Sequence, residues 1–458
     1  MKFVDRNKEI AKINHALSHP EPSFIVIYGR RRLGKSTLLK HVIKPADVYF
    51  MADQSNEHLQ RAMLVKVIAE KFEGFDAATY PDWDSLFMQI NYRAAERFVL
   101  YLDEFPLLVN SCPSLPSTLQ RLIDSNSLKF DLVICGSSQQ MMRSMVLDAS
   151  SPLYQRAHMI LNLKPIPARY LQEYFACSAQ QAVEEYAVWG GVPRYWELRA
   201  MYPSLIEAID EQIFDSDGTL YDEPGRLFAD DFNRQSLAMS LLSLVGNGVN
   251  RVSEMAARLN KKATDLSGPL ARLIEFGYLE RQIPFGENPR SSKRSYYRIS
   301  DPFMRFFFRF VTPNRSLIGL GRTQLLNQLL SQNFNDFAAE QWEHLCQQAV
   351  TGNRLMGTTW NVASRWWGGI KMGTHVKQVE LDLVAESIDH SKLLIGECKW
   401  TGHENASALL ASLKERSQGL PAAKGHQVVY ALFLKNEPDD GMREEVVLPA
   451  DVLADFKE

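Results

Sequence analysis

The sequence predicts a multidomain α/β protein with a parallel sheet first, a helical segment with a β-hairpin next, and a second α/β domain last. Three observations carry this prediction. Short apolar runs alternate with segments of helical periodicity through the first third of the chain, basic residues concentrate in the middle, and two strand patterns followed by a helix and a strand lie near the end. A chain of 458 residues with 45% hydrophobic content can bury the cores of about two to four domains.

Composition gives the broad class and compartment. The net charge of −3 gives no global signal for nucleic acid or membrane, so such partners must be inferred from local charge. The five cysteines are widely spaced and form no Cys-x-x-Cys pair, which favours reduced thiols over a disulfide framework or a zinc site. No apolar stretch approaches the ~20 residues that cross a bilayer. We therefore expect a cytoplasmic protein without a membrane partner.

The first strand pattern, residues 24–28, runs directly into a match to G-x-x-x-x-G-K-[ST], and a helical pattern follows. This strand-loop-helix context predicts a phosphate-binding loop. Its candidate nucleotide-binding residues are Gly29, Arg30, Arg31, Arg32, Leu33, Gly34, Lys35, Ser36 and Thr37.

Each residue type in the loop has a chemical reason. Gly29 and Gly34 allow the backbone to turn and to approach a polyanion closely. The helix that begins near Lys35 presents unpaired N–H groups and the positive end of its dipole to phosphate. Lys35 can reach the β- and γ-phosphates as a catalytic cation, and the Ser36 hydroxyl can hold Mg²⁺. The loop therefore predicts ATP and Mg²⁺ as ligands.

A second buried strand pattern, residues 98–105, contains an Asp-Glu pair near its carboxyl end. Asp103 is positioned to hold Mg²⁺, and Glu104 to polarise the attacking water as a catalytic residue. An acidic loop after an ordinary strand is the alternative. The spacing after the phosphate-binding loop favours the catalytic interpretation.

Two further segments carry open alternatives. After the strand pattern at 132–135, the hydroxyls of Ser137 and Ser138 can either sense the γ-phosphate or cap the helix that follows. Arg156, before a strand pattern at 159–163, is a candidate arginine finger. Arg31 and Arg32 compete for that role, and an ordinary surface position remains open for each of the three.

Several motifs together resemble the archaeal-type ATPase family, grouped with the STAND branch of AAA-related P-loop ATPases. They lie at residues 3–6, 28–36, 102–105, 151–154 and 190–193. The resemblance implies a five-stranded parallel sheet in which another strand separates the Asp103 strand from the loop strand. It also implies that Val4 and Arg6 pack near the adenine, and that residues 191–193 lie in a helical lid.

The middle of the chain changes charge abruptly. An acidic stretch at 214–233 is followed by ten Lys or Arg against five acids between Arg251 and Arg298. Three helix patterns and a hairpin pattern there predict a winged helix-turn-helix, which can bind DNA through its third helix and its wing. Packing between domains with a solvated charged face is the alternative. The candidate DNA-binding residues are Arg258, Lys261, Lys262, Arg272, Lys293 and Arg294.

Near the end, strand patterns at 377–385 and 392–400 predict a hairpin turning at Asp389 and His390. Paired residue numbers then sum to 779, so Asp382 lies opposite Glu397 and Glu380 opposite Lys399, all on one face. Two facing carboxylates can share Mg²⁺, and Lys399 can act as a catalytic residue on the attacking water. A one-residue slip of register, or a solvated face of salt pairs, is the alternative.

The order of these elements resembles the PD-(D/E)xK restriction-endonuclease-like core. A helix pattern at 334–350, bearing Glu340 as a further candidate metal ligand, precedes the hairpin, and a helix pattern at 405–418 and a strand pattern at 427–434 follow it. The resemblance implies a nuclease-like domain, which the archaeal-type ATPase family is known to carry. The Pro that often precedes the Asp is absent, and nuclease activity stays open.

The sequence thus predicts an ATPase that couples its nucleotide state to a DNA-associated, Mg²⁺-dependent nuclease-like domain. The alternatives are an ATP-gated DNA-binding or signalling scaffold whose nuclease-like domain is inactive, and an ATPase that acts on a protein partner. Assembly into a homo-oligomer is compatible with either. The expected segments are an ATPase domain at 1–200, an acidic connector at 201–233, the winged helix at 234–312 and the nuclease-like domain at 313–458.

Overall fold

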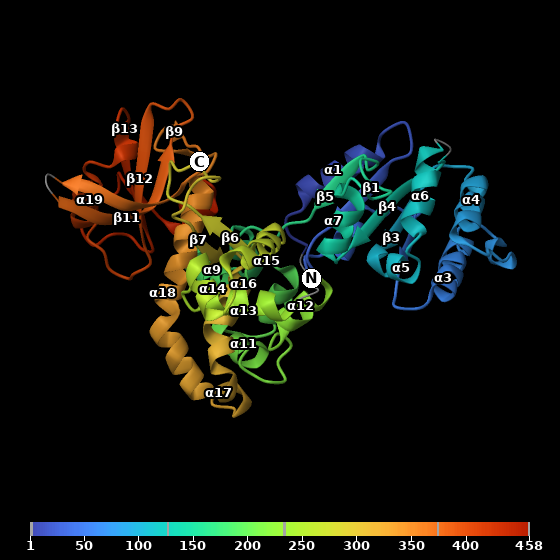
Figure 1. Cartoon of the computed structure of the whole chain (residues 1–458), viewed down its shortest axis with the longest axis horizontal. Coiled ribbons are helices and arrows are strands. Elements are labelled where there is room, and N and C mark those ends of the chain that lie inside the picture. The colour runs from blue at the N-terminus through green and yellow to red at the C-terminus, as the bar shows by residue number, and fades with distance from the viewer. Residues whose placement is uncertain (1–2, 126–127, 232–234, 373–374, 457–458) are drawn as a thin grey trace. The chain divides into compact units, whose positions relative to one another are not determined.

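The fold was analysed in a computed structural model that describes residues 3–125, 128–231, 235–372 and 375–456 (Figure 1). The chain forms two compact units. Unit 1 comprises residues 1–166, 192–194 and 225–233, and unit 2 comprises 167–191, 195–224 and 234–458. The helices that follow the sheet, from residue 167 on, group mostly with the rest of the chain.

Unit 1 is built on a five-stranded sheet with the order β2-β3-β4-β1-β5, and every pairing is parallel. Strand β4 separates β3 from β1, as the family resemblance implied. The strands are β1 Phe24–Tyr28, β2 Val48–Met51, β3 Val99–Asp103, β4 Asp131–Gly136 and β5 Met159–Asn162. The helices are α1 Asn7–Leu17, α2 Lys35–Val42, α3 Glu57–Ala69, α4 Trp83–Arg93, α5 Phe105–Ser111, α6 Leu115–Asp124 and α7 Gln139–Leu147.

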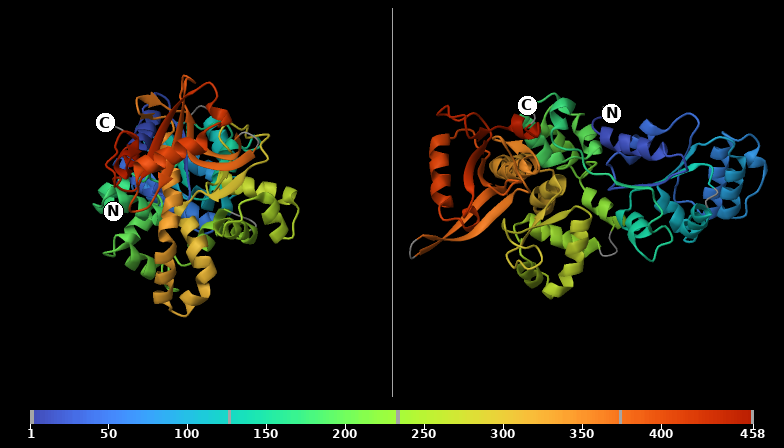
Figure 2. Two further views of the ribbon diagram at one scale, coloured as in Figure 1. Left: turned by 90° about the vertical axis from the view of Figure 1, so that its left-hand side faces the viewer. Right: turned by 90° about the horizontal axis from the view of Figure 1, so that it is seen from above.

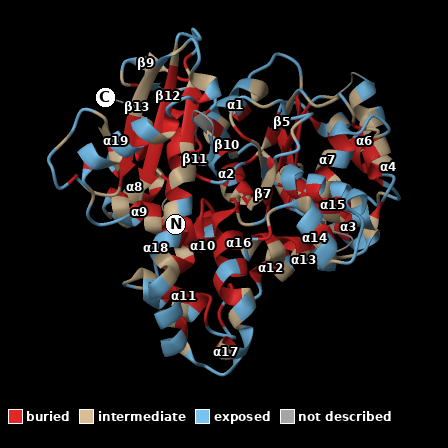
Figure 3. Ribbon diagram, turned by 60° about the vertical axis from the view of Figure 1, so that its left-hand side comes forward, coloured by how far each residue is buried: buried red, intermediate tan, exposed pale blue. Residues whose placement is uncertain are grey.

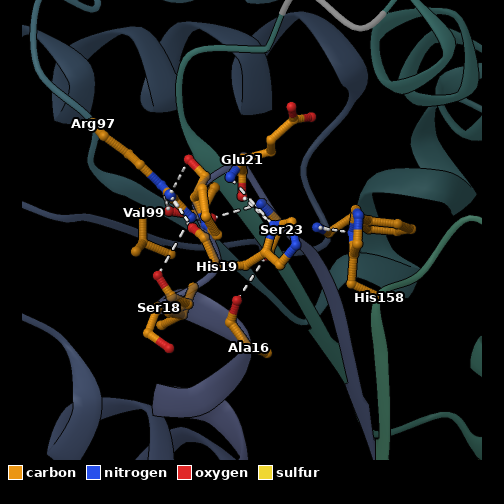
Figure 4. A network of polar contacts seen from close by, with 12 residues as sticks. Ala16, Ser18, His19, Glu21, Ser23, Arg97, Val99 and His158 are labelled. Atoms are coloured by element: carbon orange, nitrogen blue, oxygen red, sulfur yellow. Dashed lines mark hydrogen bonds and ion pairs between the residues drawn. The ribbon is translucent and has the colours of Figure 1, made fainter.

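The central strands of this sheet are buried along their whole length, while the helices keep an exposed face (Figure 3). Continuous apolar runs in β1, β3 and β4 explain this, because a parallel sheet with helices on both faces buries both faces of its strands. The amino ends of the strands are held by polar contacts. Arg97 forms an ion pair with Asp131 at 2.7 Å, and Asp131 accepts a hydrogen bond from the Ser23 N–H (Figure 4). The candidate site lies at the opposite edge of the sheet, where the strands end.

Unit 2 begins with helices and then has three helices and a hairpin in the segment where a winged helix was predicted. Its first helices are α8 Tyr170–Phe175, α9 Ala179–Trp189, α10 Pro193–Arg199 and α11 Leu205–Gln212, with the start of α10 assigned to unit 1. The winged-helix elements are α13 Gln235–Gly246, α14 Val252–Arg258, α15 Ala263–Glu275, β6 Leu279–Gln282 and β7 Tyr296–Ile299. Strands β6 and β7 pair antiparallel. The predicted three helices and hairpin are therefore present.

The acidic stretch predicted as a connector contains a helix, α12 Glu223–Asp231. Phe228 on this helix is fully buried. Acidic and Gly-containing composition marked the segment as a loop, but two adjacent apolar residues, Leu227 and Phe228, are buried. Composition alone therefore missed a helix here.

A Phe-rich segment and a long helix lead to the last domain. Helix α16 Pro302–Phe306 continues into a π-helical turn over Phe307–Val311 and a short 3-10 turn over Thr312–Asn314, and α17 Arg315–Gly319 precedes the 28-residue α18 Thr323–Val350. Five phenylalanines of this segment are buried, namely Phe303, Phe306, Phe307, Phe308 and Phe310.

The last domain contains a second five-stranded sheet with the order β10-β11-β12-β13-β14. The first three strands are antiparallel, and β13 and β14 continue in parallel. The strands are β10 Ser364–Met372, β11 His375–Glu386, β12 Lys392–Lys399, β13 Gln427–Leu434 and β14 Val446–Val447, with a small pair β8 Arg354–Leu355 and β9 Thr358–Thr359 before them. Helices α19 Ala406–Ser417 and α20 Pro449–Leu453 complete it.

Helix α19 packs on one face of this sheet through Leu410 and Leu413, and α18 contacts β11 and β12 (Figure 2). The predicted order of helix, hairpin strands, helix and strand is therefore observed. The arrangement brings side chains from α18, α19, β11 and β12 together.

Candidate functional site

The phosphate-binding loop joins β1 to α2 in the predicted strand-loop-helix arrangement. Gly34 has φ of 83°, a left-handed conformation that an L side chain rarely adopts. At Gly29 a Cβ would lie 2.7 Å from the Leu163 carbonyl oxygen, so close packing of the backbone requires glycine there. Lys35 is buried and donates hydrogen bonds to the carbonyl oxygens of Gly29 at 2.8 Å and Arg30 at 3.0 Å. The lysine therefore points into its own loop.

Asp103 ends β3 at the same edge of the sheet and is fully buried. Its Oδ1 accepts a hydrogen bond from the Glu104 N–H at 2.9 Å, and its Oδ2 accepts one from the Tyr49 hydroxyl at 2.7 Å. Burial and the neighbouring Asp103 raise the pKa of Tyr49, and the nearby Ser36 hydroxyl acts against that rise. Tyr49 thus lies beside both residues predicted to hold Mg²⁺ and binds one of them, Asp103. Sequence reasoning missed it, since a tyrosine in a strand pattern gives no signal of this contact.

Glu104 follows in a left-handed conformation, with φ of 51°, at the cap of α5. Its Oε1 accepts a hydrogen bond from the Ser137 hydroxyl at 2.7 Å. The next residue, Ser138, caps α7 by accepting a hydrogen bond from the Met141 N–H. Ser138 is therefore the helix cap, and Ser137 holds the predicted catalytic carboxylate. The sensor role at the γ-phosphate stays a prediction.

The predicted arginines near the loop have different surroundings. Arg6 donates a hydrogen bond to the Leu33 carbonyl oxygen at 3.3 Å, which places the N-terminal segment beside the loop. Arg30 is buried and Arg31 is exposed. Arg156, the candidate finger, is held by Asp124, with its Nε 2.7 Å from Oδ1 and its Nη2 2.8 Å from Oδ2. A bidentate pair of this kind must open before Arg156 can reach a phosphate.

The second candidate site lies where β11 meets β12. The observed pairs Leu383 with Gly396 through Glu386 with Leu393 have numbers that sum to 779, as predicted. The next residue, Asp382, accepts a hydrogen bond from the Cys398 N–H at 3.0 Å. Burial and the adjacent Glu397 raise the pKa of Asp382. The two predicted carboxylates are therefore neighbours.

The observed pairs of β11 with β12 end at Leu383 and Gly396, so the predicted pair of Glu380 with Lys399 is not among them. A β-bulge shifts the register of β11 against β10 between the pairs of Ser364 and Trp366. Glu380 pairs with Arg365 at 3.4 Å, and the Lys399 ammonium lies 2.8 Å from Glu397. A bulge adds one residue to a strand and so breaks the strict alternation on which the prediction relied.

Glu340 is not part of this cluster. Its carboxylate pairs with Arg305 at 2.9 Å, and its side chain is 64% exposed. Glu343, three residues further along α18, faces the cluster instead: burial and Asp382 raise its pKa to about 7. Three residues turn a helix side chain by about 60°, so the predicted helix was right but its face was misjudged.

Glu397 is buried and its two oxygens are taken by cations. Arg416 of α19 lies 2.7 Å from Oε2, and Lys399 lies 2.8 Å from Oε1. Over the described part of the chain, no group of three or more His, Cys, Asp or Glu side chains is arranged to hold a metal ion. The carboxylates of Asp382 and Glu397 are close, but a three-ligand site with Glu340 does not form.

Comparison with known proteins decides the family. Residues 3–197 match the model of an ATPase domain found predominantly in Archaea. An uncharacterized protein of Methanocaldococcus jannaschii, MJECL04, is 30% identical over 407 residues, which is 87% of this chain and 87% of that protein. The chain belongs to the archaeal-type P-loop ATPase family.

The same comparisons extend to the C-terminal half and to solved structures. Residues 307–409 of this ATPase match a family described as archaeal and bacterial proteins of unknown function. The Aeropyrum pernix ORC2 protein is similar with a TM-score of 0.44 and 14% identity, over 70% of this chain and 95% of that one. A STAND protein of Pyrococcus horikoshii gives 0.33 and 16%, over 76% of this chain and 49% of that one. The family assignment depends on the sequence matches.

The predicted DNA-binding residues of the ATPase differ in their surroundings. Arg258 pairs with Glu254 at 3.2 Å. Arg294 pairs with Glu287 and donates a hydrogen bond to the Trp367 carbonyl oxygen at 3.1 Å, so this wing residue contacts strand β10. The other four, Lys261, Lys262, Arg272 and Lys293, are exposed.

The described helices of the ATPase include none that is both long and apolar enough to cross a bilayer.

Proposed function

We propose that the protein binds and hydrolyses Mg²⁺-ATP at the loop between β1 and α2, and uses its nucleotide state to control a DNA-associated unit 2. The observation that carries the first part is the convergence of Lys35, Asp103 and Glu104 at the carboxyl edge of one parallel sheet. In open α/β sheets, ligands bind at this edge.

The donor set fits a magnesium nucleotide. The left-handed Gly34 and the helix N-terminus at Lys35 present backbone N–H groups, and Ser36 and Asp103 supply the oxygens that Mg²⁺ prefers. Ser36 and Asp103 would hold Mg²⁺, which would neutralise charge on the phosphates. Two side chains carry out the other steps. Lys35 exchanges its hydrogen bond with the Gly29 carbonyl oxygen for a contact with phosphate, and Glu104 orients the attacking water.

Glu104 does not need to move far for this role, since Ser137 fixes its carboxylate. The hydrogen bond of 2.7 Å from the Ser137 hydroxyl leaves Oε2 with only a long contact of 3.4 Å to the Ser137 N–H. We infer that Ser137 positions Glu104, and that Tyr49 holds the Asp103 carboxylate until the metal binds.

DNA is the partner that local charge favours for unit 2. The winged-helix segment carries ten basic against five acidic residues in a chain of net charge −3. Cations concentrated on one module provide the electrostatic contribution that nucleic-acid binding requires. A homo-oligomeric ATPase is compatible with this proposal.

Nuclease activity of the C-terminal domain is the second candidate function, favoured by the adjacency of Asp382 and Glu397 with Lys399 beside them. As arranged, Glu397 is held by Arg416 and Lys399, so the residues do not make a complete metal site. Cleavage would require Arg416 to release Glu397. The alternative is a scaffold in which this cluster only stabilises the sheet.

A cleavage assay separates the two. Wild type, Asp382→Ala and Lys399→Ala are incubated with single-stranded, duplex and branched DNA and with Mg²⁺ or Mn²⁺, with and without ATP. Cleavage by wild type that both variants lose supports the nuclease. Absence of cleavage by wild type on every substrate, with DNA binding retained, favours the scaffold.

A further inference from the structure

A basic groove lies in unit 2 between the wing of the winged helix and the edge of the C-terminal sheet. It has a volume of about 720 Å³. One wall comes from the start of α14 and the wing, and the other from strands β10 and β11. Its cations are Arg251, Lys293 and Arg294, and the backbone of Gly368 and Gly369 forms part of its wall.

The groove exists because the wing packs on an edge strand. Strand β10 is at the edge of its sheet, and the Phe285 N–H donates a hydrogen bond of 2.8 Å to the Arg365 carbonyl oxygen there. Covering an edge in this way satisfies its backbone groups. At Gly368 a Cβ would lie 2.6 Å from the Arg294 guanidinium, so glycine makes room for that arginine. Arg294 therefore fixes the wing to the sheet.

Arg251 is held in place from two sides. Its guanidinium carbon lies 5.3 Å from the centroid of the Tyr296 ring, and its Nη2 donates to the Tyr296 hydroxyl at 3.2 Å. Tyr296 in turn stacks on Trp367, with centroids 4.8 Å apart and an interplanar angle of 13°. An exposed arginine fixed by an aromatic stack loses little side-chain entropy when it binds an anion.

Two acidic residues near the groove form ion pairs with arginines other than Arg251 and Arg294. Glu254 pairs with Arg258, and Glu380, which lines the groove, pairs with Arg365. Lys293 is exposed and, among the residues that the structure describes, makes no ion pair. Arg251 and Lys293 therefore leave an uncompensated positive charge in a groove rimmed by Ser253 and Ser295.

Helix α15 is the expected recognition helix for the major groove of DNA, but its charges are less suited to binding DNA. Its exposed face carries Asp265 and Glu275 against one cation, Arg272. A recognition helix with acids toward the phosphates is opposed by their charge.

We propose that the groove binds the phosphodiester backbone of a nucleic acid, with Arg251 and Lys293 as its phosphate ligands. This inference rests on the proposed DNA association of unit 2 and locates the DNA-binding site in this groove. Ion pairs also connect a residue of the groove to the carboxylate cluster. Glu380 in its wall pairs with Arg365, whose Nε lies 3.9 Å from Glu343.

The test measures binding of a fluorescein-labelled DNA oligonucleotide, single-stranded and duplex, by anisotropy across a salt series. The groove variant is Arg251→Ala with Lys293→Ala, and the comparison variant is Lys8→Ala with Lys12→Ala, which removes the same charge from the exposed face of α1. Lys293→Glu is a second groove variant at an exposed position, so that an unfolded double variant cannot decide the result.

We expect the groove variants to bind at least about tenfold more weakly, and the dependence of log K on log salt to flatten by about one for each cation removed. The comparison variant should stay within about threefold of wild type. Loss of affinity in the comparison variant alone would overturn the groove while leaving DNA association intact. Wild type that binds neither DNA form would overturn the proposed function as well.

Discussion

Glu343 gives a quantitative test of the C-terminal cluster. Burial and Asp382 raise its pKa from 4.5 to about 7. Between these values the folded chain holds a proton that the unfolded chain releases, so the free energy of unfolding falls as pH rises from about 4.5 to 7. A shift of this size corresponds to about 3 kcal/mol, because each pKa unit is about 1.4 kcal/mol.

Glu343→Gln cannot ionise and removes this penalty. Relative to wild type, we expect the variant to gain about 2 to 3 kcal/mol of stability as pH rises from 4.5 to 8, on top of any constant offset from the lost carboxylate. Urea unfolding followed by tryptophan fluorescence measures it, since every tryptophan except Trp83 lies in unit 2.

The matched control is Glu340→Gln on the same helix. Glu340 is largely exposed, is paired with Arg305 and acts on Glu343 only as a minor charge, so we expect its removal to change the pH dependence of stability between pH 5 and 8 far less than Glu343→Gln does. A difference between wild type and Glu343→Gln that is equally flat over that range would refute the placement of Glu343 against Asp382.

Three predictions concern the nucleotide site. Lys35→Ala should lower affinity for ATP at least about tenfold in a fluorescent-nucleotide assay, because a charge-assisted contact contributes about 1.5 to 3 kcal/mol; unchanged affinity would exclude the loop as the phosphate site. Ser137→Ala should slow hydrolysis about tenfold or more with ATP affinity unchanged, since it releases Glu104, and equal turnover would remove Ser137 from the mechanism. Arg156→Ala should keep turnover within about threefold and lower stability by about 1 kcal/mol at most, as its pair with Asp124 is largely solvent-accessible; a hundredfold loss would restore it as the finger.

The features that sequence predicted are those encoded in a few adjacent residues. The loop at Gly29 to Ser36 and the strand ending at Asp103 carry their chemistry in local patterns, and the hairpin turn at Asp389 fixed the register that brings Asp382 to Glu397. The strand order of the first sheet came from the family resemblance, since no local pattern encodes it.

The features that sequence missed depend on contacts across the fold. The phase of α18 relative to the sheet decides between Glu340 and Glu343, and a 28-residue helix offers both. Tyr49 reaches Asp103 only because β2 and β3 are neighbours. The wing contacts β10 through Arg294 and Phe285, a packing that charge and element order in the sequence could not distinguish from a wing free to meet DNA.

Steady-state ATP hydrolysis by Glu104→Gln tests the central claim most directly. The account predicts turnover at least about a hundredfold below wild type with ATP affinity retained, because the variant keeps the loop and Asp103 but cannot orient the attacking water as a carboxylate does. Glu70→Gln, an exposed acid of the same unit, is the matched control and should hydrolyse ATP as wild type does. Turnover in Glu104→Gln equal to that of wild type would contradict the account.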